Sequence, residues 1–453
     1  MTARADTPPR RRVDGEQGFA LFFIIGLCLG LVTVVLLYAN GTALAYRASG
    51  NAVAAAQARE AVEGARRYVA YLLTNLEEPG YMPDIEAYAA EGVPLDEAAF
   101  WFVGRDANEE EPSDYYFSLM DEGAKLNLNT ATLEMIEAVP YMTTEFAAAI
   151  VDWRDADEDL TSGGAETANY LLLDPPYQCK NAPFETVEEL RLVYGAEWAE
   201  LIGEDLNFNH VLDPNEDDGD ALPPDDNQDG ILDRGLMAYF TVYSAEPNTD
   251  EEGETRVNIN GNETDRLEQV LRERLSDRAS SVMQALQGSQ GRDYQSVLEL
   301  FYATGLSVEE FAEIEPYLTV SEDERIRGLV NVNTAPEEVL VCIPGIGIDH
   351  AADLVAARTQ KTAQELRSVA WVSEVLDQTA GQLAGPYLTT RTYRVSADIA
   401  AVGRNGRGFA RTRLVFDTSG DEVVVVARQD LSRNGWPLDE EARTMTSEKR
   451  TLR

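Results

Sequence analysis

An uncharged, apolar stretch near the N-terminus constrains this chain more than any other feature. Residues 19–46 contain no charged side chain. The densest part, residues 19–38, would reach about 30 Å as a helix, which is the hydrocarbon thickness of a bilayer. Four arginines precede the stretch. The positive-inside rule therefore predicts a cytoplasmic leader and an exported bulk.

Three kinds of membrane-targeting segment fit this pattern. A cleaved secretory signal would use the A-x-A site at residues 43–45, but its apolar region would far exceed the usual length. A plain signal anchor needs no cleavage. The third kind is a type IV pilin-like signal, which is cut on the cytoplasmic side after a glycine that directly precedes an aromatic residue. Gly18 and Phe19 fit that description, and we favour this third interpretation.

The apolar helix is expected to continue beyond the membrane. Residues 45–75 contain no proline, and alanines recur there at helical spacing. One helix from Phe19 to about Asn75 would be about 85 Å long. A long apolar helix that ends in a soluble head is how pilin subunits stack into a filament.

A short string recurs three times in the exported part. In each copy two asparagines flank one apolar residue, and a helical pattern follows. Asparagine and threonine oxygens accept hydrogen bonds from the free N–H groups at a helix start. The copies are residues 125–131, 256–262 and 329–335, and related strings follow in the same order at 186–190, 295–300 and 366–369. The sequence therefore predicts three related helical modules.

The third module contains a hairpin signature. Residues 343–351 resemble a helix-hairpin-helix, with Gly345 and Gly347 in the turn. In DNA-binding members of that motif the hairpin N–H groups hold a phosphate beside a Lys or Arg. Here the stretch 336–358 holds four acids against Arg358. We therefore expect a helical packing module rather than a DNA-binding one.

The overall charge and the scarcity of some residues exclude several classes of function. The 453 residues carry a formal net charge of −43, from 37 Lys and Arg against 80 Asp and Glu. Nucleic acid is not expected as a partner, because phosphate binding needs a cationic face. The chain has three Cys and two His, too few for zinc clusters and hardly enough for Ser-His-Asp catalysis. No enzyme is therefore expected. Cys179 and Cys342 could form one disulfide in an oxidising compartment, or Cys342 could simply be a core residue.

The acidic segment 204–234 is typical of calcium binding. Its first string places oxygen ligands at EF-hand positions, with a backbone carbonyl at Val211, although His210 stands where the loop wants Gly. Its second string has the glycine, Gly230, but Leu236 at the last position leaves it incomplete. The predicted ligands are Asp205, Asn207, Asn209, Val211, Asp213, Glu216, Asp225, Asn227, Asp229 and Asp233. A third, less ordered acidic group comprises Asp155, Asp157 and Asp159 with Glu166 nearby.

Strand patterns lie before and after the modules. Residues 115–120 are a candidate strand, and residues 393–399, 411–416 and 423–427 are three more. One sheet built from these strands would pack on the N-terminal helix. The predicted fold class is α+β: a type IV pilin-like fold, with a long transmembrane helix packed on an antiparallel sheet and a large inserted helical domain of helix-hairpin-helix or SAM-like modules.

The ordered set of motifs resembles the minor pseudopilin K family of type II secretion systems. The motifs are the Gly18-Phe19 junction, residues 123–131, 151–155, 163–166, Tyr170, 174–177, 188–191, Val193 and 330–335. The resemblance implies a pilin fold with an inserted helical domain, structural Ca²⁺ in that domain, and cleavage by prepilin peptidase with methylation of Phe19. The fifth residue after the cleavage point is Phe23, where most pilin-like subunits carry Glu and this family does not.

The resemblance also implies a function, a location and partners. The expected role is at the tip of a periplasmic pseudopilus, where the subunit would initiate and cap assembly for export of folded proteins. The expected partners are minor pseudopilins I and J, other pseudopilus subunits and the inner-membrane secretion platform. The protein would cross the inner membrane once, with its bulk in the periplasm. The alternative is a membrane-anchored helix-hairpin-helix protein for DNA uptake.

These interpretations divide the chain into consecutive regions. They are a leader (1–18), a membrane and stalk helix (19–75), a pilin-like region with the first strand (76–124), module 1 (125–203), the acidic loop (204–236), module 2 (237–328), module 3 (329–389), C-terminal strands (390–430) and a flexible tail (431–453).

Overall fold

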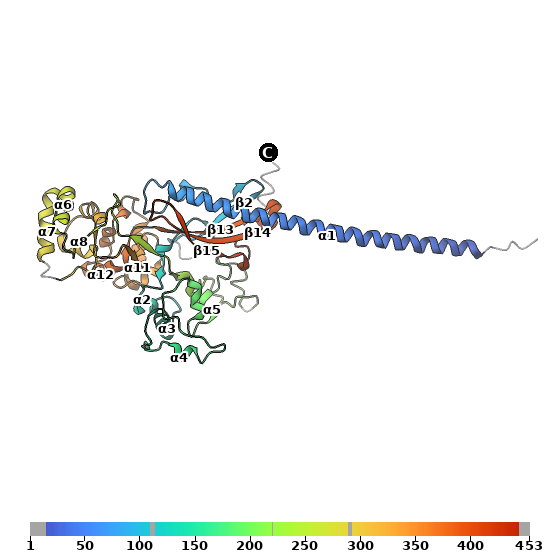
Figure 1. The fold of residues 1–453 in the computed structure, drawn as a ribbon, viewed down its shortest axis with the longest axis horizontal. Helices are drawn as coiled ribbons and strands as arrows, with labels where there is room; N and C mark the ends of the chain where they lie inside the picture. Colours follow the sequence, from blue (N-terminus) through green and yellow to red (C-terminus); the bar gives the residue numbers. More distant parts are fainter. Residues whose placement is uncertain (1–14, 109–113, 220, 289–291, 444–453) are drawn as a thin grey trace, which may run out of the picture.

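One helix dominates the shape of the molecule (Figure 1). The computed structural model describes residues 15–108, 114–219, 221–288 and 292–443, so most of the predicted leader lies outside the described residues. Helix α1, Gly15–Thr74, runs 60 residues without a break, which confirms the single long helix. The predicted Gly18-Phe19 junction lies near its start.

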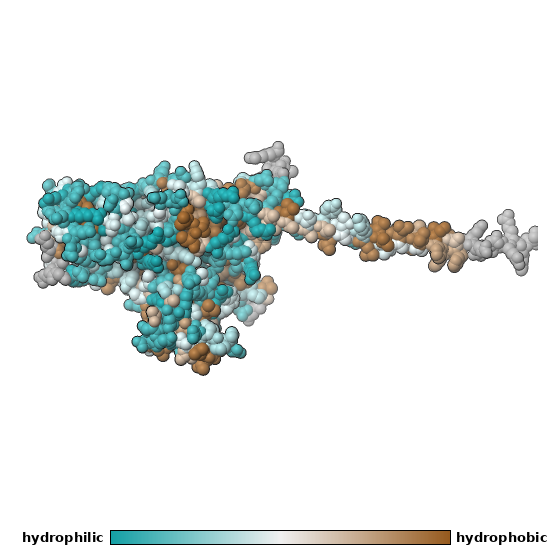
Figure 2. All heavy atoms as spheres, in the orientation of Figure 1, coloured by the Kyte–Doolittle hydropathy of each residue, from teal (hydrophilic) through white to brown (hydrophobic). Residues whose placement is uncertain are grey.

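The two halves of α1 have different environments. The first half projects alone from the head and is apolar, as Figure 2 shows in brown. Within the described residues, Phe19–Thr74 is the helix long and apolar enough to cross a membrane. The second half lies along the head (Figure 1), where Ala54, Ala58, Ala61 and Ala65 are fully buried. These small side chains let the helix backbone approach its neighbours closely.

The second half of α1 packs on a seven-stranded antiparallel sheet in the order β1-β2-β13-β14-β15, with β3 added to β2 and β4 to β13. Val62, Val69, Phe102 and Ile399 belong to the core between helix and sheet. The strands are β1 Val93–Leu95, β2 Ala98–Gly104, β3 Tyr116–Phe117, β4 Met120–Asp121, β13 Arg394–Val402, β14 Phe409–Asp417 and β15 Val424–Asp430. A helix packed on an antiparallel sheet, with helical modules inserted, is the predicted fold class.

The sequence located the C-terminal strands but misjudged the N-terminal ones. The candidate strand at 115–120 is two short strands, β3 and β4. The main N-terminal strand, β2, was missed. All seven of its residues are buried, because α1 covers one face and the C-terminal segment covers the other. A strand buried on both faces shows no polar–apolar alternation, which is the signal by which strands are found.

The predicted flexible tail is wrong for its described part, residues 431–443. Leu431 and Leu438 are buried. Trp436 packs edge-on against Trp101 of β2, with ring centroids 5.5 Å apart. The apolar area of these side chains offsets the entropy of ordering the segment. Residues 444–453 lie outside the described residues.

Three modules are inserted between β4 and β13, and each is bracketed by a short pair of parallel strands. β5, Leu126–Asn127, pairs with β6, Phe240–Thr241. β8, Val257–Asn258, pairs with β9, Leu318–Thr319. β11, Val330–Asn331, pairs with β12, Leu388–Thr389. The acidic loop at 204–236 therefore lies inside module 1, whose closing strand comes after it.

One hydrogen-bond pattern is repeated in all three modules. The second asparagine of each string, Asn129, Asn260 or Asn333, donates its side-chain amide to a carbonyl just before or at the start of the second string. The acceptors are Phe184, Tyr294 and Leu366, at 3.0, 2.8 and 2.8 Å respectively. The three modules are thus related in structure, as the repeated strings predicted.

The helices of the modules share one apolar core. Module 1 contains α2 Leu133–Glu137, α3 Thr144–Arg154, α4 Thr167–Tyr170 and α5 Trp198–Ile202. Module 2 contains α6 Thr264–Leu275, α7 Ala279–Gly288, α8 Val297–Thr304 and α9 Val308–Ala312. Module 3 contains α10 Glu337–Val341, α11 Gly347–Arg358 and α12 Gln378–Ala384. β7 Ala245–Pro247, which follows β6, pairs with β10 Arg325–Arg327, which follows β9.

Two modules contain a pair of helices joined by a short turn where the sequence places a hairpin. In module 3 the turn between α10 and α11 places Gly345 at a φ of +84° and Gly347 at +56°. In module 1 the turn between α2 and α3 places Tyr141 at a φ of +61°. Tyr141 and Gly345 both follow a proline in their turns. Tyr141 therefore adopts in module 1 the left-handed conformation of Gly345, at the cost of a strained tyrosine backbone, whereas Thr143, at the position of Gly347, has a φ of −91°.

Candidate metal centre

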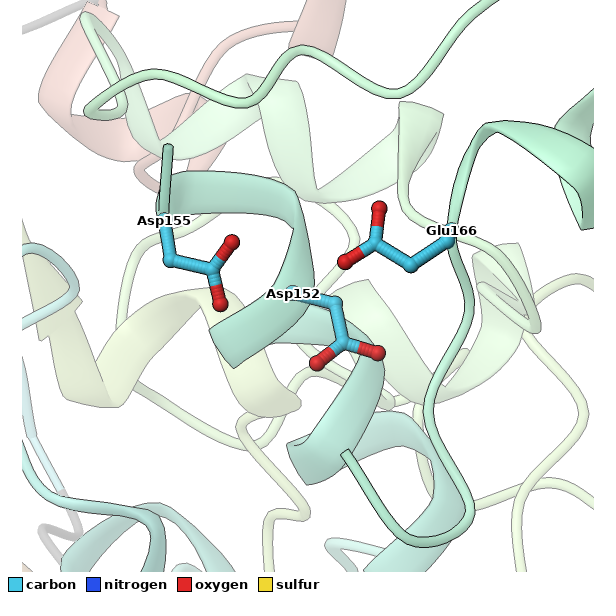
Figure 3. Close-up of side chains that lie close together, drawn as sticks. All are labelled: Asp152, Asp155 and Glu166. Atoms are coloured by element: carbon cyan, nitrogen blue, oxygen red, sulfur yellow. The ribbon is translucent and has the colours of Figure 1, made fainter. Parts of the chain in front are cut away.

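Three carboxylates of module 1 converge at the end of α3. One oxygen each from Asp152, Asp155 and Glu166 lies within 4.8 Å of the others. In Figure 3 the carboxylates of Asp155 and Glu166 point toward each other, and that of Asp152 lies below and between them. Asp152 is fully buried and Glu166 is 4% exposed. Such a group of oxygen atoms has the composition of a site for a hard divalent cation.

Local sequence explains how the three side chains meet. Asp152 and Asp155 are three residues apart at the end of a helix, so they lie on the same face. Glu166 precedes the first residue of α4 and is brought back by the loop 156–165. Gly163 has a φ of +91°, and a Cβ on Gly164 would lie 2.1 Å from Asp152 Oδ2. Two glycines are therefore required for the loop to approach Asp152 this closely.

The surroundings of the three carboxyl groups disfavour their simultaneous ionisation. Burial, and then the charges of Asp152 and Asp155, raise the pKa of Glu166 to about 7. Burial likewise raises the pKa of Asp155. A carboxyl group whose pKa is raised in this way resists ionisation unless a positive charge is supplied. A bound cation reverses that balance.

Several oxygens of the centre lack partners among the described residues. Asp152 Oδ2, Asp155 Oδ1 and both carboxylate oxygens of Glu166 are buried without a hydrogen bond. Asp152 Oδ1 accepts the N–H of Thr161 at 3.1 Å. Unpaired buried oxygens are costly, and natural structures satisfy them with a protein donor, water or an ion. The residues present thus fit a calcium ion.

The sequence named two of the three residues of this centre. Asp155 and Glu166 were placed in an acidic group with Asp157 and Asp159, but the last two are exposed and lie outside the convergent set. Asp152 was missed. Its spacing of three residues from Asp155, which places both on one face of a helix, was the signal that could have found it.

The acidic insertion forms a closed loop beside the sheet. Gly203 and Gly235 meet at its base, and Glu204 N donates to Asp233 O at 2.6 Å. A Cβ on Gly203 would lie 2.1 Å from the carbonyl of Asp233. The ends of the loop therefore touch, and both glycines have positive φ.

The first predicted calcium string is folded tightly around its acids. Asp205 accepts the N–H groups of Asn209 and His210 at 2.9 and 3.0 Å. Glu216 accepts those of Leu206 and Asp213 at 3.2 and 2.9 Å. His210 has a φ of +67°, so it adopts the left-handed conformation for which an EF-hand uses glycine.

The side chains of this string also converge. The amides of Asn207 and Asn209 both donate to Asp213 Oδ2, at 2.6 and 3.0 Å. Asn207 Oδ1 is buried without a partner among the described residues. Val211 donates its N–H to Asn209 Oδ1 at 2.8 Å. These four residues therefore lie together, with the amides of Asn207 and Asn209 donating to Asp213.

Burial disfavours the charged forms of the two innermost acids. It raises the pKa of Asp205 to about 6 and that of Glu216 to about 8. Asp205 and Glu216 are each 1% exposed. Within the described residues, however, Asp205, Asp213 and Glu216 do not form a group of three carboxylates as close as that around Glu166.

The second predicted string is more open. Asp225, Asn227 and Asp229 are exposed. Asn227 donates its amide to Asp233 Oδ2 at 3.2 Å. The carboxylate of Glu204, which the sequence did not single out, accepts the N–H groups of both Asn227 and Asp233. Glu204 is thus the buried acid of this half of the loop.

The loop is attached to the sheet through Arg411 of β14. Arg411 is fully buried and forms a bidentate ion pair with Asp398 of β13, at 2.8 Å for both contacts. The same guanidinium donates to the carbonyls of Asn207 and Phe208 in the loop. Asn209 also donates to the carbonyl of Pro437 at 2.9 Å. The first predicted string is therefore fixed to both the sheet and the C-terminal segment.

The two candidate disulfide cysteines are free. Cys179 lies in module 1, with its Sγ 3.6 Å from the carbonyl of Asp152. Cys342 lies in module 3 and donates to Glu338 O in its own helix at 3.2 Å. Both are buried in the apolar core. The structure therefore does not contain the predicted disulfide, and the two thiols lie in different modules.

The arginine of the module 3 hairpin is engaged in contacts within the protein, both inside its module and with Ala107 and Asn108. Arg358, at the end of α11, is 3% exposed and donates to the carbonyls of Val332 and Ala335. A phosphate bound at the hairpin needs a cation that can reach it. This arginine instead holds the module together, which disfavours the DNA-binding alternative.

Module 1 is similar in sequence to known proteins. Residues 123–201 match the family model of type II secretion system protein K, which confirms the resemblance predicted from the motifs. The chain is 36% identical over 70 residues to type II secretion system protein K of Klebsiella pneumoniae, a match that covers 16% of this chain and 22% of that relative. The match thus spans about a fifth of the relative's length.

A solved structure is also similar in outline. It is the GspK-GspI-GspJ complex from the type 2 secretion system of enterotoxigenic Escherichia coli. The match has a TM-score of 0.37 and 14% identity, and it covers 86% of this chain and 95% of that chain.

Proposed function

We propose that this protein is a minor pseudopilin at the tip of the periplasmic pseudopilus of a type II secretion system, where it helps to initiate and cap assembly. The observation that supports this most is the match of residues 123–201 to protein K of such systems. That segment forms a module inserted into a head with a pilin-like helix and sheet. The role is structural, and no catalytic step is assigned to it.

The N-terminal helix suits a subunit at the end of a filament. Its exposed apolar half fits an inner-membrane anchor, with the head in the periplasm. The fifth residue after Gly18 is Phe23, which is 69% exposed and carries no charge. In a filament interior, a carboxylate at this position would neutralise the N-terminal amine of a neighbouring subunit. A subunit without it needs no such neighbour, and its large head disfavours a place within the shaft.

The proposed partners follow from this role. Prepilin peptidase would cut between Gly18 and Phe19 and methylate Phe19. Minor pseudopilins I and J would form the tip with this chain, on top of other pseudopilus subunits. The inner-membrane platform would supply the driving force for extension.

Calcium is the proposed structural cofactor. Asp152, Asp155 and Glu166 would hold one ion, which would supply the positive charge that their buried oxygens lack. The acidic loop would hold further calcium through Asp205, Asn207, Asn209, Val211, Asp213 and Glu216, and through Asp225, Asn227, Asp229 and Asp233. Oxygen ligands of this kind suit Ca²⁺ better than Mg²⁺, which demands a tighter octahedral shell.

The test of the function uses the full-length chain in its host. Deletion of its gene should abolish release of secreted proteins into the medium, and the unmodified chain should restore it. Mass spectrometry of the restored protein should find methylated Phe19 as the first residue. A Gly18→Trp variant should remain uncleaved and should not restore secretion. The control Gly15→Trp, three residues upstream, should be cleaved and should restore secretion. A mature N-terminus at Tyr46 would indicate an ordinary signal peptide and would contradict the proposal.

A further inference from the structure

A cavity of about 550 Å³ lies between the sheet and module 1. Arg413 and Val415 of β14 line it. Leu414 and Phe416 belong to the core beneath α1, so Arg413 and Val415 point to the other face of the sheet. Figure 1 shows α1 on one side of the sheet and α5 of module 1 on the other. Packed interiors contain few voids larger than a water molecule, and this cavity has the size of a small-molecule site.

Basic side chains gather in the wall of the cavity. Arg105, Lys125 and Arg413 all line it, and their side chains are 12%, 18% and 22% exposed. They come from three separate segments, because Arg105 follows β2, Lys125 precedes β5 and Arg413 lies on β14. The whole chain carries a formal net charge of −43. Its composition therefore does not explain this gathering of mostly buried cations.

Arg413 shares its acidic partner with a second arginine. Asp398 accepts two hydrogen bonds from Arg411, both at 2.8 Å, and one from Arg413 at 3.3 Å. Arg413 makes this contact through one nitrogen, Nη2, and its Nε is buried without a partner among the described residues. The guanidinium of Arg413 thus keeps most of its capacity to donate hydrogen bonds.

Arg105 and Lys125 are also incompletely neutralised. Glu338 pairs with Arg105 at 2.8 Å and with Arg234 at 3.3 Å, so one carboxylate again serves two guanidinium groups. Arg105 Nε is buried, and the described part of the chain offers it no partner. Lys125 Nζ lies 3.5 Å from Glu122, which is longer than a charge-assisted hydrogen bond. The ion pairs therefore leave positive charge in the wall.

The acidic side chains in the wall have hydrogen-bond donors of their own. They are Asp106, Asp121, Glu122, Glu188 and Asp430, which accept from Asn108, Asn331, Thr241, Gln429 and Ser432 respectively. By contrast, the buried polar atoms of described lining residues that lack a partner are nitrogens of Arg105, His210 and Arg413. A ligand with negatively charged oxygen atoms satisfies cationic nitrogen donors best.

Two ionisable groups feel this excess of positive charge. Burial lowers the pKa of Lys125, the charge of Glu122 opposes this effect, and the charge of Arg413 lowers the pKa further. Burial, followed by the charges of Arg413 and Arg105, holds the pKa of His210 well below its ordinary value. A nearby anion would counteract the effect of these charges on both groups.

The rest of the wall offers apolar surface. Trp198, Phe208, Met237 and Tyr243 also line the cavity. Small-molecule sites typically combine such a surface with a few polar groups that fix the orientation of the ligand. The wall therefore suits a ligand that carries an anionic group on an apolar body.

We propose that the cavity between the sheet and module 1 binds a small carboxylic acid with an aromatic or other apolar body. The carboxylate would accept hydrogen bonds from Arg105, Lys125 and Arg413, and the body would lie against Trp198 and Phe208. The planar guanidinium groups favour a carboxylate, because it can accept two parallel N–H bonds. This binding site is independent of the proposed role in secretion, since it depends only on the cavity wall.

Equilibrium dialysis of the full chain tests the site, with the same detergent on both sides of the membrane. The probe is naphthoate, and its neutral analogue naphthamide has the same aromatic body. Naphthoate should bind at least about tenfold more tightly than naphthamide, a difference of about 1.4 kcal/mol. Arg413→Gln and Lys125→Gln should each weaken naphthoate binding by about tenfold. Arg407→Gln, at an exposed position, is the matched control and should leave it unchanged.

Chemical modification of the unmodified chain gives a second measurement that needs no variant. Naphthoate should protect Lys125 from acylation, as followed by peptide mass spectrometry, and naphthamide should not. Equal binding of the two probes, or binding of naphthoate without protection of Lys125, would overturn the site. No binding of either probe would mean that the cavity holds only water, which also contradicts the proposal. Displacement of naphthoate by minor pseudopilins I and J would assign the cavity to a carboxylate of a partner protein instead.

Discussion

Arg358 occupies in module 3 the position that Arg154 occupies in module 1. Arg358 donates to the carbonyl of Ala335 at 2.5 Å, and that alanine ends the repeated string of its module. Arg154 donates to the carbonyl of Ala131 at 2.5 Å, and that alanine ends the equivalent string. The last turn of the second hairpin helix is thus tied to the start of its own module in both cases.

Loss of this link should destabilise module 3. Arg358→Met would leave the buried carbonyls of Val332 and Ala335 without their donor, at about 1–3 kcal/mol for each unsatisfied group. We expect the free energy of unfolding to fall by about 2–4 kcal/mol, measured by urea titration of the full chain in detergent. Arg433→Met, at an exposed position, should change it by less than about 0.5 kcal/mol. Equal effects of the two variants would contradict the structural role of Arg358.

The direction in which Glu166→Gln shifts the melting temperature shows whether the carboxylate centre holds calcium. With calcium bound, Glu166→Gln removes a ligand and should lower the melting temperature of the full chain. Without an ion, the same change removes a buried acid that resists ionisation and should raise the melting temperature at pH 7. We expect the first result, together with the loss of about one calcium ion per chain in metal analysis. Asp159→Asn, at an exposed neighbouring acid, should have neither effect.

Calcium in the acidic loop should be detectable by chelation. Binding to the folded state stabilises it by about 2.7 kcal/mol at a hundredfold excess over the dissociation constant. Chelator should therefore lower the melting temperature and expose residues 204–234 to protease. Asp205→Ala combined with Glu216→Ala should reproduce much of that loss and blunt any further effect of chelator.

The control for the loop is Asp217→Ala, because Asp217 is exposed beside Glu216. It should leave melting and protease resistance unchanged. If the unmodified protein melts at the same temperature with calcium and with chelator, the loop is only a solvated acidic segment.

Stability should depend on pH through Glu315, which lies far from the proposed calcium ligands in sequence. Its carboxylate accepts hydrogen bonds from Ser368 and Val369, and Arg391 and Arg256 act on it electrostatically. Burial raises its pKa above the ordinary value. Between the ordinary and the raised pKa the folded state binds more protons than the unfolded state, so stability falls as pH rises through this window.

Glu315→Gln removes that titration. The stability of the unmodified chain relative to this variant should decrease from pH 4 upward, by at most about 1.4 kcal/mol per pH unit. Urea titrations of both proteins at several pH values measure the difference. Glu313→Gln, two residues away and exposed, should show no such trend. A difference that grows with pH would mean that the folded environment favours the charged form of Glu315.

Much of the candidate site could be predicted from the local sequence. The repeated asparagine strings predicted three modules, and each second asparagine forms the same hydrogen bond. The positive φ of His210 was anticipated from the EF-hand spacing. Asp152 was not identified, because its role depends on Glu166, which the loop with Gly163 and Gly164 brings back from a different segment.

The sequence by itself determined the features that depend on neighbours along the chain. An uncharged stretch of sufficient length becomes the exposed half of α1, and repeated capping strings become repeated modules, because helix formation and capping are local. Only the tertiary structure decided which strand is central, where module 1 closes and which acids converge. β2 is buried on both faces by segments far away in sequence, and β6 completes module 1 only after the whole acidic loop. Such pairings depend on contacts between distant residues, for which the local pattern carries no periodic signal.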